Sequence, residues 1–127
     1  ELLHSRRCIA SIDLDCFYAQ CEELREPALK GSPIGVQQKM LVITSNYAAR
    51  AYGIQKGDSL VAVRRKCPHI TIRLGEDLTF YRQVSQQVAN FVGSWCERVT
   101  AVERLGLDEL FVDLTEEVNH RLAAQTG

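Results

Sequence analysis

Residues 10–24 read ASIDLDCFYAQCEEL, and this stretch decides how the chain begins to fold. Polarity alternates along residues 8–14, which is the pattern of a half-buried β-strand. From Cys16 the period becomes helical, and the apolar stripe that it predicts is formed by Phe17, Cys21, Leu24 and Ala28. Asp13 and Asp15 therefore lie where a buried strand turns into a helix, although packing alone gives no reason for carboxylates there.

The composition is that of an ordinary soluble domain. The 127 residues are 46% hydrophobic and 24% charged, which supplies one modest core. The formal net charge of −1 gives no overall basic field that would by itself indicate nucleic acid as a partner. No apolar run approaches the ~18 residues of a membrane span, and no signal-peptide pattern opens the chain, so we expect no membrane association.

The cysteines favour a reducing compartment. There are five of them, an odd number, and no two form a CxxC pair. This pattern fits neither a zinc knuckle nor a disulfide framework. We therefore expect free thiols, as in a cytosolic or nuclear protein.

Periodicity predicts the elements that follow. They are a hairpin of residues 34–37 and 41–44 around the turn QQKM, helices over residues 45–53, 59–67 and 77–96, and a short strand over residues 70–74. Asn46 or Ser45 can cap the first of these helices, and Gly53 can end it. The longest helix has a predicted core stripe of Leu78, Tyr81, Val84, Val88, Phe91, Val92 and Trp95. Residues 99–117 read as strand, tight turn and strand, and a last helix begins near Thr115.

This order of elements predicts an α+β fold. Removing residues 20–76 leaves a strand, a helix, a hairpin and the start of another helix. Those elements are the opening of a split βαβ, ferredoxin-like layout. The removed block would form a small inserted α/β subdomain.

Acidic residues also occur at a second point in the sequence, far from Asp13. Asp13 ends the first expected strand, and Asp108 and Glu109 occupy the turn of the later hairpin. In a ferredoxin-like sheet the first strand can lie beside that hairpin, so that the three carboxylates converge. Their mutual repulsion is relieved by hard divalent cations such as Mg²⁺, and two such ions serve phosphoryl or nucleotidyl transfer. The pattern alone does not separate a polymerase from a nucleotide cyclase.

A phosphate-binding group is also predicted. Tyr47 and Arg50 are three residues apart on one helical face, and Thr44 lies just before this helix. A hydroxyl, a phenol and a guanidinium at a helix N-terminus could hold a triphosphate. The alternative is a packed tyrosine beside a surface arginine. Likewise, the basic residues 64–66 could contact a nucleic-acid backbone or simply form a solvated face.

Four motifs together carry a family resemblance. They are DLDCFYAQCE (residues 13–22), TSNYAARAYG (44–53), GEDLTFYRQVS (75–85) and LGLDELFVDLT (105–115). With these motifs the chain resembles the Y-family, translesion DNA polymerases from about Cys8 to Glu116. The segments GVQQKMLVIT, LGEDLTFYR and VERLGLDE favour one branch of that family. Gly106 stands where the wider family usually has serine, and this departure agrees with the same branch.

The resemblance implies a metal site. Asp13, Asp108 and Glu109 would hold two Mg²⁺ or Mn²⁺ ions, and Leu14 would add its backbone carbonyl. Asp15, although only two residues from Asp13, is not expected to be a ligand and is assigned to the turn. Asp113 is likewise not an expected ligand.

The resemblance also implies a nucleotide site. The backbone N–H groups of Cys16 and Phe17 would bind the triphosphate, and Tyr18 would be the steric gate that excludes a 2′-hydroxyl. Thr44, Tyr47 and Arg50 would bind the β- and γ-phosphates. Gln38 and Leu41 would lie over the templating base.

At the level of domains the resemblance implies a palm of residues 1–17 and 78–127 with fingers inserted at residues 18–77. The thumb and little finger of the family have no counterpart here, so we expect little or no processive synthesis by this chain alone. The implied partners are primer–template DNA and deoxynucleoside triphosphates, with a sliding clamp, ubiquitin and other translesion factors for the full-length parent, in the nucleus. Two alternatives stay open: a truncated, non-catalytic form that binds nucleotide or a partner, and a palm-type nucleotide cyclase.

Overall fold

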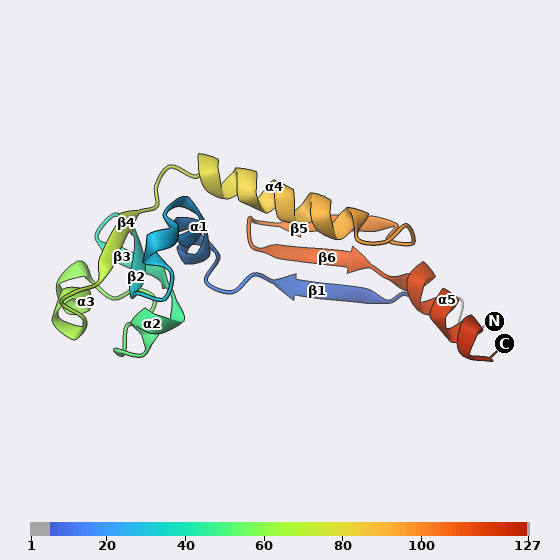
Figure 1. The fold of residues 1–127 in the computed structure, drawn as a ribbon, viewed down its shortest axis with the longest axis horizontal. Coiled ribbons are helices and arrows are strands. Elements are labelled where there is room, and N and C mark those ends of the chain that lie inside the picture. Colours follow the sequence, from blue (N-terminus) through green and yellow to red (C-terminus); the bar gives the residue numbers. More distant parts are fainter. Residues whose placement is uncertain (1–5, 127) are drawn as a thin grey trace. The chain divides into compact units, whose positions relative to one another are not determined.

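The computed structural model describes residues 6–126 and has the expected α+β character (Figure 1). In chain order the elements are β1 (Ile9–Asp13), α1 (Phe17–Arg25), the 3₁₀ helix η1 (Pro27–Leu29), β2 (Ile34–Gln38), β3 (Leu41–Ser45), α2 (Tyr47–Arg50), α3 (Leu60–Lys66), β4 (Thr71–Leu74), α4 (Thr79–Ser94), β5 (Ala101–Leu105), β6 (Glu109–Asp113) and α5 (Thr115–Thr126). The described chain forms two compact units, one of residues 6–14 and 82–126 and the other of residues 15–81.

The first unit is built on a three-stranded antiparallel sheet in the order β1-β6-β5. Alternation along β6 buries Leu110 and Val112, each 2% exposed, on one face of this sheet. The part of α4 in this unit lies against the sheet, since Ser85 accepts a hydrogen bond from Arg104 of β5 at 3.1 Å. A side chain added at Gly93 of α4 would meet Val102 of β5 at 3.7 Å, which shows how closely the helix approaches.

The second unit has a mixed sheet in the order β3-β2-β4, with β2 antiparallel to β3 and parallel to β4. Its main core cluster consists of Val42, Ala49, Ile54, Val63, Cys67 and Ile70. A second cluster joins Ala19 of α1 to Ile34 and Val36 of β2. Gly75, the residue after β4, approaches β2 very closely. A Cβ added at Gly75 would stand 2.4 Å from a methyl group of Val36, so only glycine fits there without a shift.

Asn46 connects several parts of this second unit. Its Oδ1 accepts hydrogen bonds from the backbone N–H groups of Ala49 and Ile34, each at 3.0 Å. The first bond caps α2, as one of the two predicted caps should. Its Nδ2 donates to the Ser32 carbonyl oxygen at 2.7 Å and to the Glu23 carboxylate at 3.2 Å. One side chain thus fixes α2, β2 and the loop before β2.

The predicted apolar stripe of α1 is wrong in its second half. Leu24 is exposed, and Ala28 lies beyond the helix in η1, also exposed. The helix ends at Arg25 because Glu26 leaves the helical conformation with φ −137° just before Pro27. The face that α1 does bury consists of Phe17, Ala19, Cys21 and Glu22.

The predicted core stripe of α4 is also too long. The helix spans Thr79–Ser94, which is shorter at both ends than residues 77–96. Tyr81 and Val84 are buried, whereas Phe91 is 68% exposed and Trp95 is 54% exposed. In addition, Glu109 is the first residue of β6 and not part of the turn.

The described residues contain neither a membrane-spanning helix nor a disulfide. Between residues 6 and 126, no helix has the length and apolar character that crossing a bilayer requires. All five cysteines fall in this range and are free thiols.

Candidate functional site

Asp13, Asp108 and Glu109 lie at one end of the β1-β6-β5 sheet. Asp13 and Glu109 are direct partners in the antiparallel pairing of β1 with β6, so their side chains leave the same face of the sheet. Just beyond the pair, the backbone N–H of Leu14 donates to the carbonyl oxygen of Asp108 at 2.8 Å. The turn before Asp108 contains Gly106 with φ +64°, a left-handed conformation that glycine adopts without steric cost.

This acidic end has the donor chemistry of a Mg²⁺ or Mn²⁺ site. Asp13, Asp108 and Glu109 offer hard carboxylate oxygens, which such ions prefer. Like charges directly opposite each other in a sheet destabilise it, and a cation would relieve the repulsion between Asp13 and Glu109. Among residues 6–126, however, no three histidine, cysteine, aspartate or glutamate side chains are near enough to one another to enclose a metal ion. Asp13 and Glu109 are therefore adjacent in the sheet and Asp108 lies in the turn beside them, but the three predicted carboxylates do not form a closed ligand set.

A strained turn separates this end of the first unit from α1. Cys16, the residue before the helix, has φ 36° and ψ 51°, which is unusual for a residue other than glycine. The side-chain amide of Gln20 donates to the carbonyl oxygen of Asp15, and the backbone N–H of Gln20 donates to that of Cys16 at 3.0 Å. Partial burial raises the pKa of the Cys16 thiol, and the nearby Arg50 guanidinium opposes that shift.

Tyr47 and Arg50 lie together, as their spacing predicts. The Arg50 guanidinium carbon is 5.0 Å from the centre of the Tyr47 ring, within the range of a cation–π contact. The Tyr47 hydroxyl donates to Oδ2 of Asp15 at 3.1 Å, a partner that the sequence pattern does not indicate. This hydrogen bond raises the pKa of Tyr47, and the charge of Asp15 adds to the shift. Thr44 lies half-buried in β3, opposite Val36.

The helix that carries Tyr47 is weaker as an anion site than its sequence suggests. It contains only the four residues Tyr47–Arg50, and its Ala49 N–H already donates to the Asn46 side chain. Side chains, and not a helix dipole, must therefore supply most of any attraction for phosphate here. In the basic segment of residues 64–66, Lys66 donates to Asp58 at 2.8 Å and to the Gly53 carbonyl oxygen at 3.0 Å. Its ammonium group is therefore already paired within the chain.

Tyr18 has a supporting pair that periodicity misses. Its ring stacks on that of Tyr81, with centroids 4.2 Å apart and an angle of 13° between the planes. The Tyr81 hydroxyl donates to Oε2 of Glu22 at 2.7 Å, although Glu22 is only 4% exposed and Tyr81 only 1%. Burial, and to a smaller extent this hydrogen bond, raises the pKa of Tyr81 strongly. The only sequence signal was that Tyr18 lies off the apolar stripe and on the same side of α1 as Glu22.

The two residues predicted to contact a template base lie at the turn of the β2–β3 hairpin. Gln38 and Leu41 are paired across it, and Leu41 is 47% exposed. The Gln38 side-chain amide donates to the carbonyl oxygen of Gly75 at 2.8 Å. This bond orients the amide group and leaves its oxygen able to accept another hydrogen bond.

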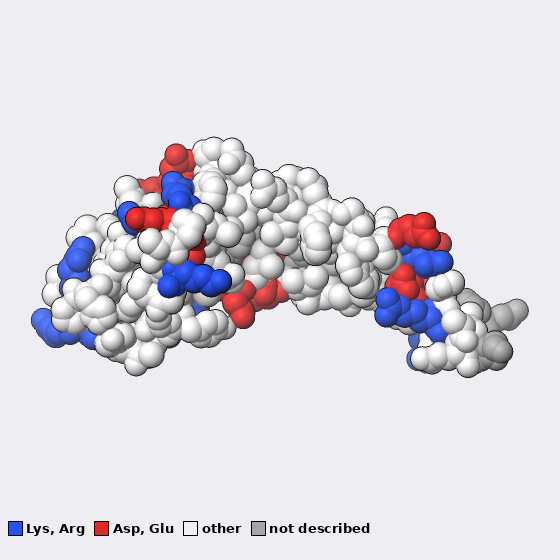
Figure 2. All heavy atoms as spheres, viewed as in Figure 1, with Lys and Arg blue, Asp and Glu red and all other residues white. Residues whose placement is uncertain are grey.

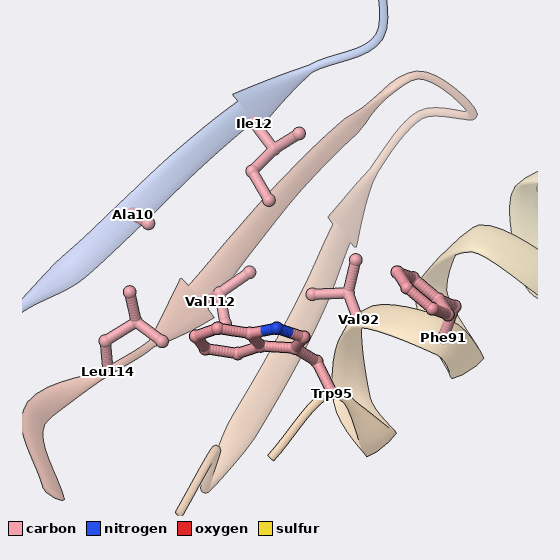
Figure 3. Close-up of a pocket in the computed structure, with 7 residues that line it drawn as sticks. All are labelled: Ala10, Ile12, Phe91, Val92, Trp95, Val112 and Leu114. Atoms are coloured by element: carbon pink, nitrogen blue, oxygen red, sulfur yellow. The ribbon is translucent and has the colours of Figure 1, made fainter. Parts of the chain in front are cut away.

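An apolar pocket lies on the sheet of the first unit (Figure 3). Its volume is about 170 Å³, and its lining residues are Ala10, Ile12, Phe91, Val92, Trp95, Val112 and Leu114. In Figure 3, Ala10, Ile12, Val112 and Leu114 come from β1, β6 and the residue after β6, and the Trp95 ring reaches beneath Val112 from the residue after α4. In Figure 2 the surface over α4 shows almost no Lys, Arg, Asp or Glu side chains. None of the lining side chains is acidic, basic or able to bind a metal ion, so this pocket offers no groups for acid–base or metal chemistry.

Comparisons with known proteins agree with the motif pattern. Residues 12–126 match the profile of the impB/mucB/samB family. The chain is 48% identical over 120 residues to DNA polymerase iota of Mus musculus and 49% identical over 118 residues to DNA polymerase iota of Homo sapiens. These matches cover 94% and 93% of the chain but only 16% of each relative. It is also 36% identical over 118 residues to DNA polymerase IV of Mannheimia succiniciproducens, covering 90% of the chain and 32% of that protein.

Proposed function

The chain belongs to the impB/mucB/samB family, and from this membership we propose that it forms the palm and fingers of a Y-family DNA polymerase. The proposed reaction is template-directed transfer of a nucleotide from a deoxynucleoside triphosphate to a primer 3′-hydroxyl during translesion synthesis. The chain spans about one sixth of the animal relatives, 16% of their length. For a protein of the relatives' length, we extend the proposal to primer–template DNA, a sliding clamp, ubiquitin and a nuclear location.

The observation that carries the proposal is the pairing of β1 with β6. It places Asp13 opposite Glu109 and ties Leu14 to Asp108 by a 2.8 Å backbone hydrogen bond. Residues from opposite ends of the sequence thus bring three carboxylates to one end of the sheet. Structural ion pairs do not account for this group, since none of the salt bridges between described residues includes any of the three.

We assign Asp13, Asp108 and Glu109, with the carbonyl oxygen of Leu14, to hold two Mg²⁺ or Mn²⁺ ions. Such ions, when bound, promote deprotonation of a hydroxyl nucleophile and stabilise the charge that develops on a transferring phosphoryl group. The role of the protein groups is to fix these ligands on paired strand ends, so that little reorganisation is needed when substrate binds.

We assign the triphosphate to the other unit. The backbone N–H groups of Cys16 and Phe17 and the side chains of Thr44, Tyr47 and Arg50 would bind its oxygens. The contact between Arg50 and Tyr47 supports this assignment, because it presents a guanidinium and a hydroxyl together. Gln38 and Leu41 would contact the template base.

Tyr18 is assigned to exclude the 2′-hydroxyl of a ribonucleotide. Its stacking on the buried ring of Tyr81 supports the role, because a sugar-excluding side chain must resist displacement. A side chain that could rotate away would exclude nothing.

We propose that residues 1–17 and 78–127 are palm and residues 18–77 are fingers, with the β1-β6-β5 sheet as part of a ferredoxin-like palm. The boundaries of the two compact units support this division, since one of them comprises residues 15–81. The antiparallel sheet with its covering helix supports the assignment of the palm.

The test is primer extension by a chimera. Residues 6–126 would replace the matched segment of human DNA polymerase iota, to which the chain is 49% identical. Extension by the chimera is expected, and Asp108→Ala should abolish it, while Glu103→Gln on β5 should not. In the same chimera Tyr18→Ala should admit ribonucleotides. Extension that survives Asp108→Ala would refute the metal site, and unchanged sugar discrimination would refute the role of Tyr18.

A further inference from the structure

The hydrogen bond between Tyr47 and Asp15 joins two elements of the proposed triphosphate site. Asp15 belongs to the turn before α1, and Tyr47 begins α2. The 3.1 Å bond from the Tyr47 hydroxyl to Oδ2 of Asp15 spans 32 residues of sequence. The turn itself is tied to α1 by the Gln20 side chain, which donates to the Asp15 carbonyl oxygen. Asp15 is thus held at two points, its backbone carbonyl by Gln20 and its carboxylate by Tyr47.

A carboxylate in this position has the chemistry of a phosphate oxygen. It is anionic, it accepts the hydroxyl of Tyr47, and Tyr47 also contacts the Arg50 guanidinium. A tyrosine hydroxyl has one proton to donate, so it cannot donate fully to Asp15 and to a phosphate at once. Because hydrogen bonds with an ionised partner are the stronger kind, the two anions compete for this donor.

We infer that Asp15 is a positioning residue that holds the Tyr47 hydroxyl and must release it when a triphosphate binds. The inference rests on the proposed function, because it takes the triphosphate subsite of Tyr47 and Arg50 as given. It adds that the affinity of the subsite is set partly by an internal competitor. Holding Tyr47, which is 61% exposed, also limits the orientations of its ring beside Arg50.

The first test asks whether the bond exists in solution. The sequence has four tyrosines, so a chain labelled with ¹³C at the ring carbon that bears the hydroxyl gives four NMR signals, and Tyr47→Phe identifies the one from Tyr47. Asp15→Asn should shift the Tyr47 signal and leave the others in place. The control Glu76→Gln, which removes one negative charge from an exposed position in the same unit, should shift none. A Tyr47 signal that does not respond to Asp15→Asn overturns the inference.

The second test measures competition with inorganic triphosphate in the presence of Mg²⁺. Asn is a neutral and weaker acceptor, so Asp15→Asn should tighten triphosphate binding about fivefold, whereas Glu76→Gln should not. Simple relief of repulsion would have a similar effect, and a double-mutant cycle separates the two explanations. If Asp15 acts by holding the hydroxyl, the gain from Asp15→Asn disappears in a Tyr47→Phe background. If the gain persists there, the inference is overturned.

Failure of the proposed site gives a different result. Triphosphate that binds equally to the wild type and to Arg50→Ala would refute the assignment of Arg50 in the proposed function. Triphosphate that binds to no variant would overturn the subsite and the competition together. Weaker binding by Arg50→Ala, with no change on Asp15→Asn, would leave the proposed function in place and remove only the role of Asp15.

Discussion

At the scale of single residues, the buried carboxylate of Glu22 depends on one hydroxyl. Tyr81 donates to it at 2.7 Å, and Arg25 lies farther away, at 3.7 Å. Removal of one partner of a buried hydrogen bond leaves the other to bear its desolvation cost, which is about 1–3 kcal/mol and more when the group is charged. Tyr81→Phe should therefore destabilise the chain by at least about 1–3 kcal/mol in urea denaturation.

A matched control for this change is Tyr52→Phe. The Tyr52 hydroxyl also contacts a polar side chain, since it lies 3.3 Å from Nε2 of His69, but this contact is exposed. Its loss should change the free energy of unfolding by no more than about 0.5 kcal/mol. Equal effects of the two substitutions would mean that the buried carboxylate does not depend on Tyr81.

At the scale of elements, the cap of α2 should matter more than its four residues suggest. Asn46→Ala would leave the buried N–H groups of Ile34 and Ala49 without their acceptor. A cap is worth about 0.5–2 kcal/mol, and an unsatisfied buried donor about 1–3 kcal/mol, so the loss should total about 2–4 kcal/mol. Urea denaturation monitored by circular dichroism would measure it.

The cap of α3 provides the comparison for this prediction. Ser59 accepts a hydrogen bond from the Ala62 N–H, at 3.1 Å and in an exposed setting. Ser59→Ala should therefore cost about 1 kcal/mol. If Asn46→Ala is no worse than Ser59→Ala, the hydrogen bonds of Asn46 outside α2 contribute little.

The helix α5 should be sensitive to acid through Glu117. Acidic and basic side chains alternate on the surface around this helix (Figure 2). The Glu117 carboxylate accepts hydrogen bonds from the Cys96 thiol at 3.0 Å and from Arg121 at 2.7 Å. Both bonds lower the pKa of Glu117, and the bond from Cys96 has the larger effect. The contribution to stability is fully present above the ordinary pKa of glutamate, about 4.3, and is lost as pH falls below it through the folded-state pKa.

Glu117→Gln isolates this contribution. The pKa values of Asp58 and Asp113 are also lowered, by the hydrogen bonds of Lys66 and of Thr115 respectively, so the wild type loses stability in acid for several reasons. The difference in unfolding free energy between wild type and Glu117→Gln should shrink from pH 7 to pH 3. A difference that stays constant over this range would show that the charge of Glu117 is not coupled to folding.

Sequence patterns anticipated the contacts that are local in the chain. The spacing of Tyr47 and Arg50 predicted that the two side chains share one helical face, and they are in contact. Patterns of this kind report which side of an element a residue occupies. They do not report what lies opposite, so the exposure of Trp95, which depends on packing around the sheet, was missed.

The polar contacts of the candidate site were beyond sequence reasoning for the same reason. The carboxylate of Glu22 accepts its hydrogen bond from Tyr81, which is 59 residues away, so the local pattern of α1 gives no indication of it. Asp15 was assigned to the turn, which its backbone bond to Gln20 fits, but its bond to Tyr47 spans 32 residues. A buried or paired carboxylate is recognisable only when its donor is known.

At the scale of the whole molecule, the two units have cores of different quality. The largest fully buried side chains are Tyr81, Ile34, Val36, Val42, Val63, Cys21, Cys67 and Ser85, and all but Ser85 belong to residues 15–81. The other unit has the 170 Å³ pocket in its apolar face and exposes Phe91 and Trp95. Because unfilled apolar space and exposed aromatic surface both reduce the gain from burial, this unit should be the less stable of the two.

Unequal cores predict that unfolding has two transitions. Trp95 is the only tryptophan in the sequence and belongs to the less stable unit, so its fluorescence reports that unit alone. In urea, the fluorescence transition should precede the main transition in far-ultraviolet circular dichroism. Asn46→Ala, in the other unit, should lower the midpoint of the later transition and leave the fluorescence midpoint unchanged. If both signals instead shift together in the variant and coincide in the wild type, the two cores unfold as one cooperative structure.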